Sequence, residues 1–150
     1  MLYYKIAPKC NTELFLTLNL DPNNSAVLLK DLAQDQDKDR QLWTPVEIIT
    51  GTEDKGYALL NKYANKVISA RGERQPLTQI SLSEAFESKV ATWRFLPVRD
   101  GFGGFQLPAN TSMNLNVFGD GPYISGNPVG IHDWKDGADN EIWTLTRVEG

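Results

Sequence analysis

The residue types best suited to chemistry gather in the stretch NPVGIHDWKDGADNEIW, which runs from Asn127 to Trp143. This stretch contains His132, the only histidine of the chain, with two of the four tryptophans and a run of Asp, Gly and Asn. Imidazole, carboxylate, amide and indole groups at this density could form a catalytic loop, a metal site, a nucleic-acid contact or a ligand pocket. Each possibility makes a different demand on the rest of the chain.

Catalysis finds little support among the residues around His132. No serine stands in a nucleophile-elbow motif, and Cys10 lies far away in the chain. Asp133 and Asp136 could be paired as in a glycosidase, but nothing in the sequence marks either carboxyl group as buried. We therefore predict a protein that is not an enzyme, without catalytic residues and without a cofactor.

The sequence does not predict a metal site either. The run DLAQDQDKDR places four aspartates between residues 31 and 40. A calcium loop that begins at Asp35 needs Gly at its sixth position and Glu at its twelfth, where this chain has Arg40 and Val46. Zinc is disfavoured because the single histidine and the single cysteine are far apart. The acidic run is interpreted as a solvated loop.

Charge and composition narrow the choice of partner. The formal net charge is -4, and the 15 basic residues are scattered without a run. Nucleic acid and membranes are therefore not expected partners, because a phosphate backbone calls for a dense basic surface. No apolar stretch reaches the roughly 20 residues that cross a bilayer, and the N-terminus lacks the features of a signal peptide. We expect a cytoplasmic protein, or one released without a signal peptide.

A regular spacing of tryptophans in the sequence predicts the strands that position these residues. Trp43, Trp93 and Trp143 are spaced 50 residues apart, within the similar frames RQLWTPVEI, VATWRFLPV and NEIWTLTRV. Each frame alternates apolar and polar positions, as a half-buried strand does. A recurring period of this length is typical of a repeat architecture.

Three further strands are predicted upstream of each tryptophan. The first reads aromatic-polar-aliphatic, and two more apolar segments follow it; the nine segments are residues 4–6, 57–59 and 105–107, then 16–18, 67–69 and 115–117, then 26–29, 78–80 and 129–131. The pattern predicts an all-β chain with four strands in each of the repeats 1–50, 51–100 and 101–150, which form a single domain over residues 1–150. Three such units can close on themselves, with the tryptophans in the core. The segment LLKDLAQDQDK is interpreted as a turn or a short helical piece.

Each repeat ends in an element similar to Gln-any-Trp: Arg40-Gln41-Leu42-Trp43, Val90-Ala91-Thr92-Trp93 and Asn140-Glu141-Ile142-Trp143. In this respect the chain resembles the ricin B-type (R-type) β-trefoil lectins, whose repeats carry Asn-Gln-any-Trp near their ends. The resemblance implies a β-trefoil of three four-stranded repeats of about 50 residues with pseudo-threefold symmetry. It also implies a shallow sugar site, with the residue at position 141 holding the loop.

The third repeat carries the most complete copy of the family pattern. His132 stands at the place of the aromatic plate, with Trp134 as the nearby alternative on the same side of the strand. Asn140 is expected to take sugar hydroxyls, and Asn116 stands where the family usually has Asp. The predicted site consists of Asn116, Gly119, Asp120, His132, Trp134 and Asn140. A possible second site in the first repeat contains Asn19, Asp21 and Asp39, and none is expected in the second repeat.

The function implied by the resemblance is a lectin that recognises galactose- or N-acetylgalactosamine-type glycans. A single shallow site binds weakly, so a homodimer is a plausible source of avidity. Two alternatives remain open. One is a β-trefoil protease inhibitor that acts through the exposed loop 31–40 or 81–89, and the other is the targeting module of a toxin.

Overall fold

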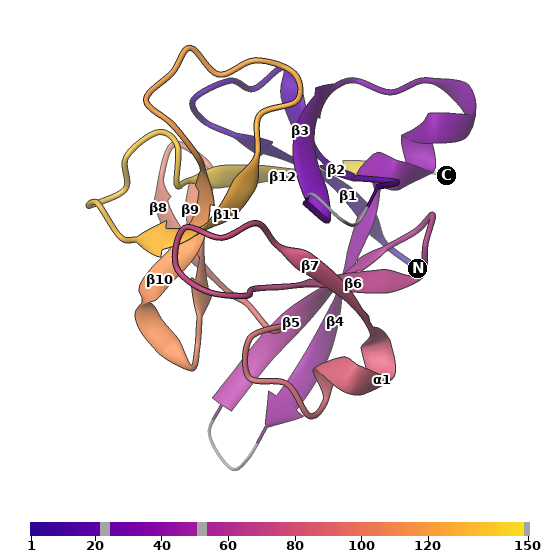
Figure 1. Cartoon of the computed structure of the whole chain (residues 1–150), viewed down its shortest axis with the longest axis vertical. Helices are drawn as coiled ribbons and strands as arrows, with labels where there is room; N and C mark the ends of the chain where they lie inside the picture. The colour runs from indigo at the N-terminus through magenta and orange to yellow at the C-terminus, as the bar shows by residue number, and fades with distance from the viewer. Residues whose placement is uncertain (22–24, 51–53, 149–150) are drawn as a thin grey trace.

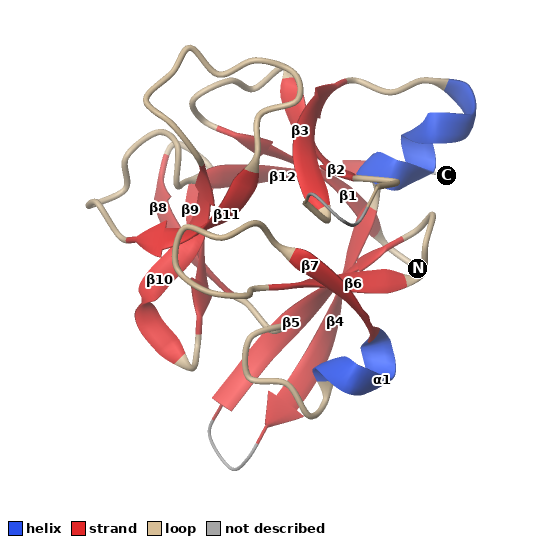
Figure 2. Cartoon of the chain, viewed as in Figure 1, coloured by secondary structure: helices blue, strands red, loops and turns tan. Residues whose placement is uncertain are grey.

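The computed structural model describes residues 1–21, 25–50 and 54–148, and most of them lie in β-strands (Figures 1 and 2). The strands, four from each repeat, are β1 (Tyr3–Pro8), β2 (Leu14–Leu18), β3 (Val27–Asp31), β4 (Trp43–Thr50), β5 (Asp54–Asn61), β6 (Lys66–Ser69), β7 (Thr78–Ser81), β8 (Arg94–Arg99), β9 (Phe102–Leu107), β10 (Asn110–Val117), β11 (Val129–Asp133) and β12 (Trp143–Val148). The four-strand pattern predicted for each repeat is confirmed, with shifts only at the strand ends.

The first and last strands of the three repeats close into a six-stranded antiparallel barrel. β1 pairs with β12 and β4, β4 pairs with β5, and β9 pairs with β8 and β12. The remaining seam joins β5 to the residue before β8, where Tyr57 and Trp93 exchange two backbone hydrogen bonds of 2.8 Å. Each barrel strand thus finds a partner on both sides, which protects its edges.

The two middle strands of each repeat form hairpins, β2–β3, β6–β7 and β10–β11. Backbone hydrogen bonds tie these hairpin regions to one another, from Ala26 N to Leu77 O, from Arg74 N to Ile131 O and from Gly126 N to Leu29 O. Each repeat therefore contacts both others through its hairpin. A barrel with three linked hairpins is the β-trefoil arrangement with pseudo-threefold symmetry that the resemblance implied.

The three periodic tryptophans lie in the core, as predicted. The exposed fractions of Trp43, Trp93 and Trp143 are 0%, 1% and 0%. The indole Nε1 of Trp43 donates to Leu16 O at 2.9 Å, and that of Trp143 donates to Leu115 O at 3.0 Å. The Nε1 of Trp93 has no hydrogen-bond partner within the described residues. The second repeat therefore keeps the tryptophan but has lost its hydrogen bond.

The third repeat is shifted relative to the alignment read from the sequence. Tyr4 pairs with Trp43 and Tyr57 with Trp93, whereas Trp143 pairs with Gly103 and not with Phe105. Phe105 is accordingly the counterpart of Ile6 and Leu59, one layer deeper in the barrel. The slip of two residues preserves the inward and outward alternation of the strand, so the period-two pattern could not reveal it.

Two short helical segments lie outside the barrel (Figure 2). A 3-10 helix, η1, covers Asp35–Gln41. The short helical piece expected over residues 28–38 is therefore confirmed only in its second half, because the first residues of that segment belong to β3. The α-helix α1 (Leu82–Ala85) was not predicted, although its capping box is visible in the sequence. Ser81 Oγ accepts from Glu84 N while Glu84 Oε1 accepts from Ser81 N. Among the described residues, no helix is long and apolar enough to span a membrane.

Candidate functional site

A pocket of about 510 Å³ opens in the third repeat, beside the β10–β11 hairpin. Five of the six residues predicted for the site line this pocket, and Trp134 does not. The second repeat also contributes, because Arg74 reaches the pocket from the segment between β6 and β7. The lining residues are Arg74, Asn116, Val117, Phe118, Gly119, Asp120, Tyr123, His132, Lys135 and Asn140.

Asn116 and Asn140 present hydrogen-bond acceptors to the pocket. The side chain of Asn116, only 2% exposed, donates from Nδ2 to Asn114 O at 3.0 Å and to His132 O at 3.3 Å. Asn140 donates from Nδ2 to Val117 O at 3.0 Å, and its backbone O accepts from Val117 N at 2.8 Å. Since both amide NH₂ groups are held by the backbone, the two side-chain carbonyl oxygens remain to accept from a ligand.

The turn after β10 supplies two aromatic rings that the sequence argument did not assign. Phe118 packs over Gly130, a position where a Cβ atom would collide with the ring. Tyr123 donates its hydroxyl to Gly119 O at 2.8 Å, and this bond fixes the ring across the turn. Gly119 has φ +98, a conformation that L side chains rarely adopt, so the turn needs glycine there. The pocket thus has a fixed aromatic surface beside its acceptors.

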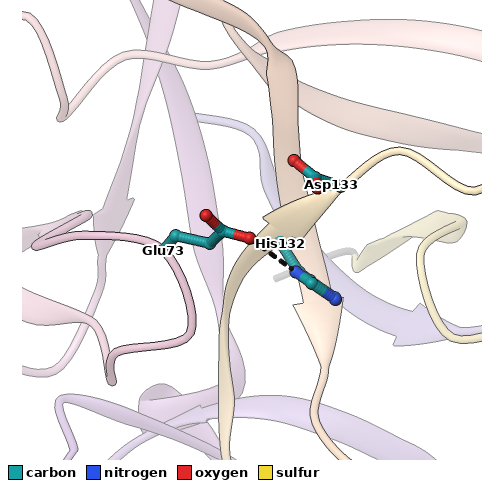
Figure 3. A group of neighbouring side chains, drawn as sticks. All are labelled: Glu73, His132 and Asp133. Atoms are coloured by element: carbon teal, nitrogen blue, oxygen red, sulfur yellow. Dashed lines mark ion pairs between the residues drawn. The ribbon is translucent and has the colours of Figure 1, made fainter.

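His132 lies on β11 and faces a residue of the second repeat. Its Nδ1 is 3.3 Å from Oε1 of Glu73, and the two side chains point toward each other (Figure 3). The side chain of His132 is 24% exposed and that of Glu73 is 45% exposed. The contact could not be predicted from the period, because it joins two different repeats.

Glu141 is a fully buried carboxylate that organises the loop between β11 and β12. It accepts backbone N–H bonds from Lys135 at 2.8 Å, Gly137 at 2.8 Å and Ala138 at 3.1 Å. Gln41 closes the corresponding loop of the first repeat, where it donates to Asp31 O and accepts from Ala33 N. Gln41 and Glu141, which stand two residues before Trp43 and Trp143, therefore each hold the loop of their own repeat, as the resemblance implied for position 141.

Trp134 lies outside the pocket, so its prediction as an alternative plate is corrected. The strand β11 ends at Asp133, although Trp134 N still donates to Ser112 O at 3.0 Å. The indole ring of Trp134 instead covers Gly104, where a Cβ atom would lie 2.9 Å from Cζ3 of the ring, and approaches Gly137. The missing side chain of Gly104 creates the surface that receives the indole.

The three residues predicted for a second site, Asn19, Asp21 and Asp39, do not line the third-repeat pocket. Asn19 is engaged in its own turn, donating from Nδ2 to Asp21 O at 3.0 Å and accepting from Asp21 N at 3.2 Å. Asp39 lies 3.5 Å from the Lys62 Nζ instead. Thr17 occupies the place that Asn116 has in the third repeat, and its hydroxyl contacts Gln41 and Phe15 O.

A second pocket of about 420 Å³ is lined by the barrel strands and is mostly apolar. Tyr4 and Tyr57 stand at equivalent positions on its wall, and the third equivalent position is Gly103. The Phe95 ring occupies the space that a side chain at Gly103 would need. This pocket lies in the barrel rather than beside a hairpin, and sequence analysis did not anticipate it.

No protein-family model matches the sequence, and no curated protein matches it. Three-dimensional similarity is much clearer. The chain is similar to ThreeFoil, a designed threefold-symmetric protein, with a TM-score of 0.78, 20% identity and coverage of 97% of this chain and 99% of that one. It is also similar to the ricin B-like lectin of Macrolepiota procera in complex with lactose, with a TM-score of 0.72, 18% identity and coverage of 97% and 95%.

A longer protein contains a similar region. A Clostridium perfringens endo-β-galactosidase that releases GlcNAcα1-4Gal matches with a TM-score of 0.78 and 15% identity. The match covers 99% of this chain but only 33% of the enzyme. These similarities show that the chain has the β-trefoil fold found in ricin B-like lectins, a fold that also occurs as one part of larger proteins.

Proposed function

We propose that this protein binds carbohydrate through the third-repeat pocket and acts by recognition, without turnover. The observation that carries the proposal is that Asn116 and Asn140, whose amide nitrogens are bonded to the backbone, line one pocket together with Tyr123. The lactose bound by the Macrolepiota lectin supports the same class of ligand. Galactose and N-acetylgalactosamine are the proposed terminal sugars.

The chemistry of a pyranose suits this arrangement. One face of the ring carries C–H bonds that pack against an aromatic surface, and hydroxyls around its edge form hydrogen bonds. We assign the packing surface to Tyr123, whose ring is fixed by its bond to Gly119 O. The two asparagine oxygens accept from neighbouring hydroxyls, while His132, Arg74 and Lys135 supply donors.

We expect a dissociation constant near 1 mM for a monosaccharide at this single site, or about -4 kcal/mol. Binding at useful strength then depends on several sites that act together. We propose a homodimer as the source of this avidity.

The test is an NMR titration of the purified protein with lactose and with N-acetylgalactosamine, combined with a glycan array. We expect Tyr123→Ala and Asn140→Ala to weaken binding at least about tenfold, equivalent to about 1.4 kcal/mol. Tyr123→Phe keeps the ring but loses the bond to Gly119 O, so it should weaken binding less than Tyr123→Ala does. Lys30→Ala is the matched control, because Lys30 occupies in the β2–β3 hairpin the position that His132 has in β10–β11.

Circular dichroism establishes that each variant is folded. Unchanged binding by both Tyr123→Ala and Asn140→Ala would remove the proposed site. Nanomolar inhibition in a protease panel, together with an empty glycan array, would replace the lectin proposal by the inhibitor alternative that acts through residues 31–40 or 81–89.

A further inference from the structure

We propose that Glu73, His132 and Asp133 form a binding site for a divalent transition metal ion of the Zn²⁺ class. The three residues each offer one ligand atom, and these atoms all lie within 4.8 Å of one another (Figure 3). This inference concerns metal binding alone and does not rest on the proposed sugar site. The sequence did not predict this metal site, because Glu73 and His132 belong to different repeats and lie far apart in the sequence.

The ligand atoms of Glu73 and His132 are spaced as two ligands of one metal ion are. His132 Nδ1 is 3.3 Å from Glu73 Oε1, yet Nδ1 is buried and has no hydrogen-bond partner within the described residues. A buried nitrogen left unpaired is costly, by about 1–3 kcal/mol. Two atoms 3.3 Å apart and each about 2.1 Å from a zinc ion subtend an angle of about 104°, close to the tetrahedral value.

Asp133 completes the set of protein ligands. It follows His132 at the end of β11, and its carboxylate oxygen lies within 4.8 Å of the Glu73 and His132 ligand atoms. Because two atoms bound about 2.1 Å from one zinc ion lie at most about 4.2 Å apart, we expect the Asp133 side chain to turn toward the other two ligands when the ion binds. One imidazole and two carboxylates suit zinc and similar first-row ions, whereas magnesium and calcium prefer oxygen ligands alone. Three protein ligands leave a fourth position for water or for another molecule.

The main chain holds Glu73 in place against β11. Arg74 N donates to Ile131 O at 2.9 Å, and Pro76 forms a bridge with Gly130. The Nε of Arg74 is 4.0 Å from Glu73 Oε1, but both side chains of this pair are largely exposed, so it competes weakly with a metal ion. The carboxylate is therefore presented to His132 by a fixed backbone.

A metal ion at Nδ1 would leave the proton of a neutral His132 on Nε2. Because His132 also lines the third-repeat pocket, the site lies at the boundary between the pocket and the second repeat.

The test uses untagged protein, stripped with a chelator and titrated with Zn²⁺ in competition with a chromogenic chelator. We expect one ion per chain, and we expect Glu73→Gln, Asp133→Asn and His132→Gln each to weaken binding roughly tenfold or more. Glu87→Gln, on an exposed residue of the second repeat, is the matched control and should bind like the parent protein. Co²⁺ provides a second readout, since an imidazole and carboxylate site gives visible absorption that the three variants should lose.

The same titration separates this site from the other candidates. Burial raises the pKa of the Cys10 thiol to about 11, so Cys10 is a poor ligand near neutral pH, and Cys10→Ser should bind zinc like the parent protein. No sugar is present, so failure here leaves the proposed function untouched. Zinc binding that survives both Glu73→Gln and Asp133→Asn, that disappears in Cys10→Ser, or that is absent from the parent protein would overturn the proposal.

Discussion

Glu141 shows how one residue fixes the loop that carries Asn140. Its buried carboxylate collects three backbone N–H groups from residues 135–138, and Asn140 precedes it directly. The amide of Gln41 does the same work in the first repeat by both donating and accepting. Glu141 differs from Gln41 because its carboxylate only accepts hydrogen bonds. This suits a tight loop in which several backbone N–H groups point toward one side chain.

We predict that Glu141→Ala lowers the free energy of unfolding by about 2–4 kcal/mol, because it leaves several N–H groups without acceptors and removes buried volume. Urea denaturation measures the loss, with Glu87→Ala as the exposed control. Glu141→Gln keeps one acceptor oxygen and should cost less. A loss below that of the control would mean that the loop is held by other contacts.

At the residue scale the sequence predicted the polar part of the pocket and missed much of the rest. Asn116, His132 and Asn140 were predicted from the resemblance to the ricin B-type lectins, and all three line one pocket. Tyr123 lies in an irregular turn and Arg74 belongs to another repeat, so no period points to either. Trp134 was predicted beside His132, but its ring packs against Gly104 and does not line the pocket.

At the scale of elements, β11 packs closely against the segment that carries Glu73. Gly130 makes this possible, since a Cβ atom there would collide with the Phe118 ring and come within 2.5 Å of Gln75 O. The Phe118 ring could rotate away, but the Gln75 oxygen can move only if the backbone of residues 73–76 moves with it. The contact between the second and third repeats therefore requires glycine at this position.

Gly130→Ala should lower the free energy of unfolding by about 1–3 kcal/mol, the usual cost of overpacking. It should also displace residues 73–76, which an NMR spectrum would record as shifts at Arg74 and Gln75. Gly119→Ala provides a comparison, because a Cβ atom at that position meets no atom within 4 Å and any cost arises from its φ of +98. Unchanged shifts at Arg74 and Gln75 would contradict the prediction.

The strands themselves were accessible from the sequence, because alternation and turn residues repeat three times. Their exact alignment was not, as the two-residue slip between Phe105 and its expected partners shows. Helix α1 was missed although Ser81 and Glu84 form a capping box, because a single turn of helix has no apolar period to mark it.

At the scale of the whole molecule, the three tryptophans form an internal comparison. Each occupies the same place in its repeat and is fully buried, but only Trp43 and Trp143 donate from Nε1 to a backbone carbonyl within the described residues. The carbonyl oxygens of Leu16 and Leu115 depend on these bonds.

We predict that Trp43→Phe and Trp143→Phe are each more destabilising than Trp93→Phe, by about 1 kcal/mol. All three substitutions create a similar cavity, so the difference isolates the hydrogen bond. Chemical denaturation of the three variants under the same conditions gives the ranking. Trp93→Phe as the most damaging of the three would refute this account.

Contacts between repeats are the part of the molecule that a period cannot reveal. Glu73 and His132 are brought together by the packing of one hairpin on the next, and nothing in either segment alone indicates the other. The symmetry was predicted from spacing, whereas the places where repeats meet follow from side-chain packing around the axis.

The pairing of β1 with β12 runs over six residue pairs, from Tyr3 with Val148 to Pro8 with Trp143, so the first and last strands lie side by side. Because the barrel is closed, the chain could begin and end in another of its turns without changing which strands pair. A circular permutant could be opened in the turn at Asp100 and Gly101, with a linker that joins the present ends. It would keep every strand pairing, but the lobe of β9–β12 would be synthesised first. The order in which lobes are synthesised can thus be varied independently of the final topology.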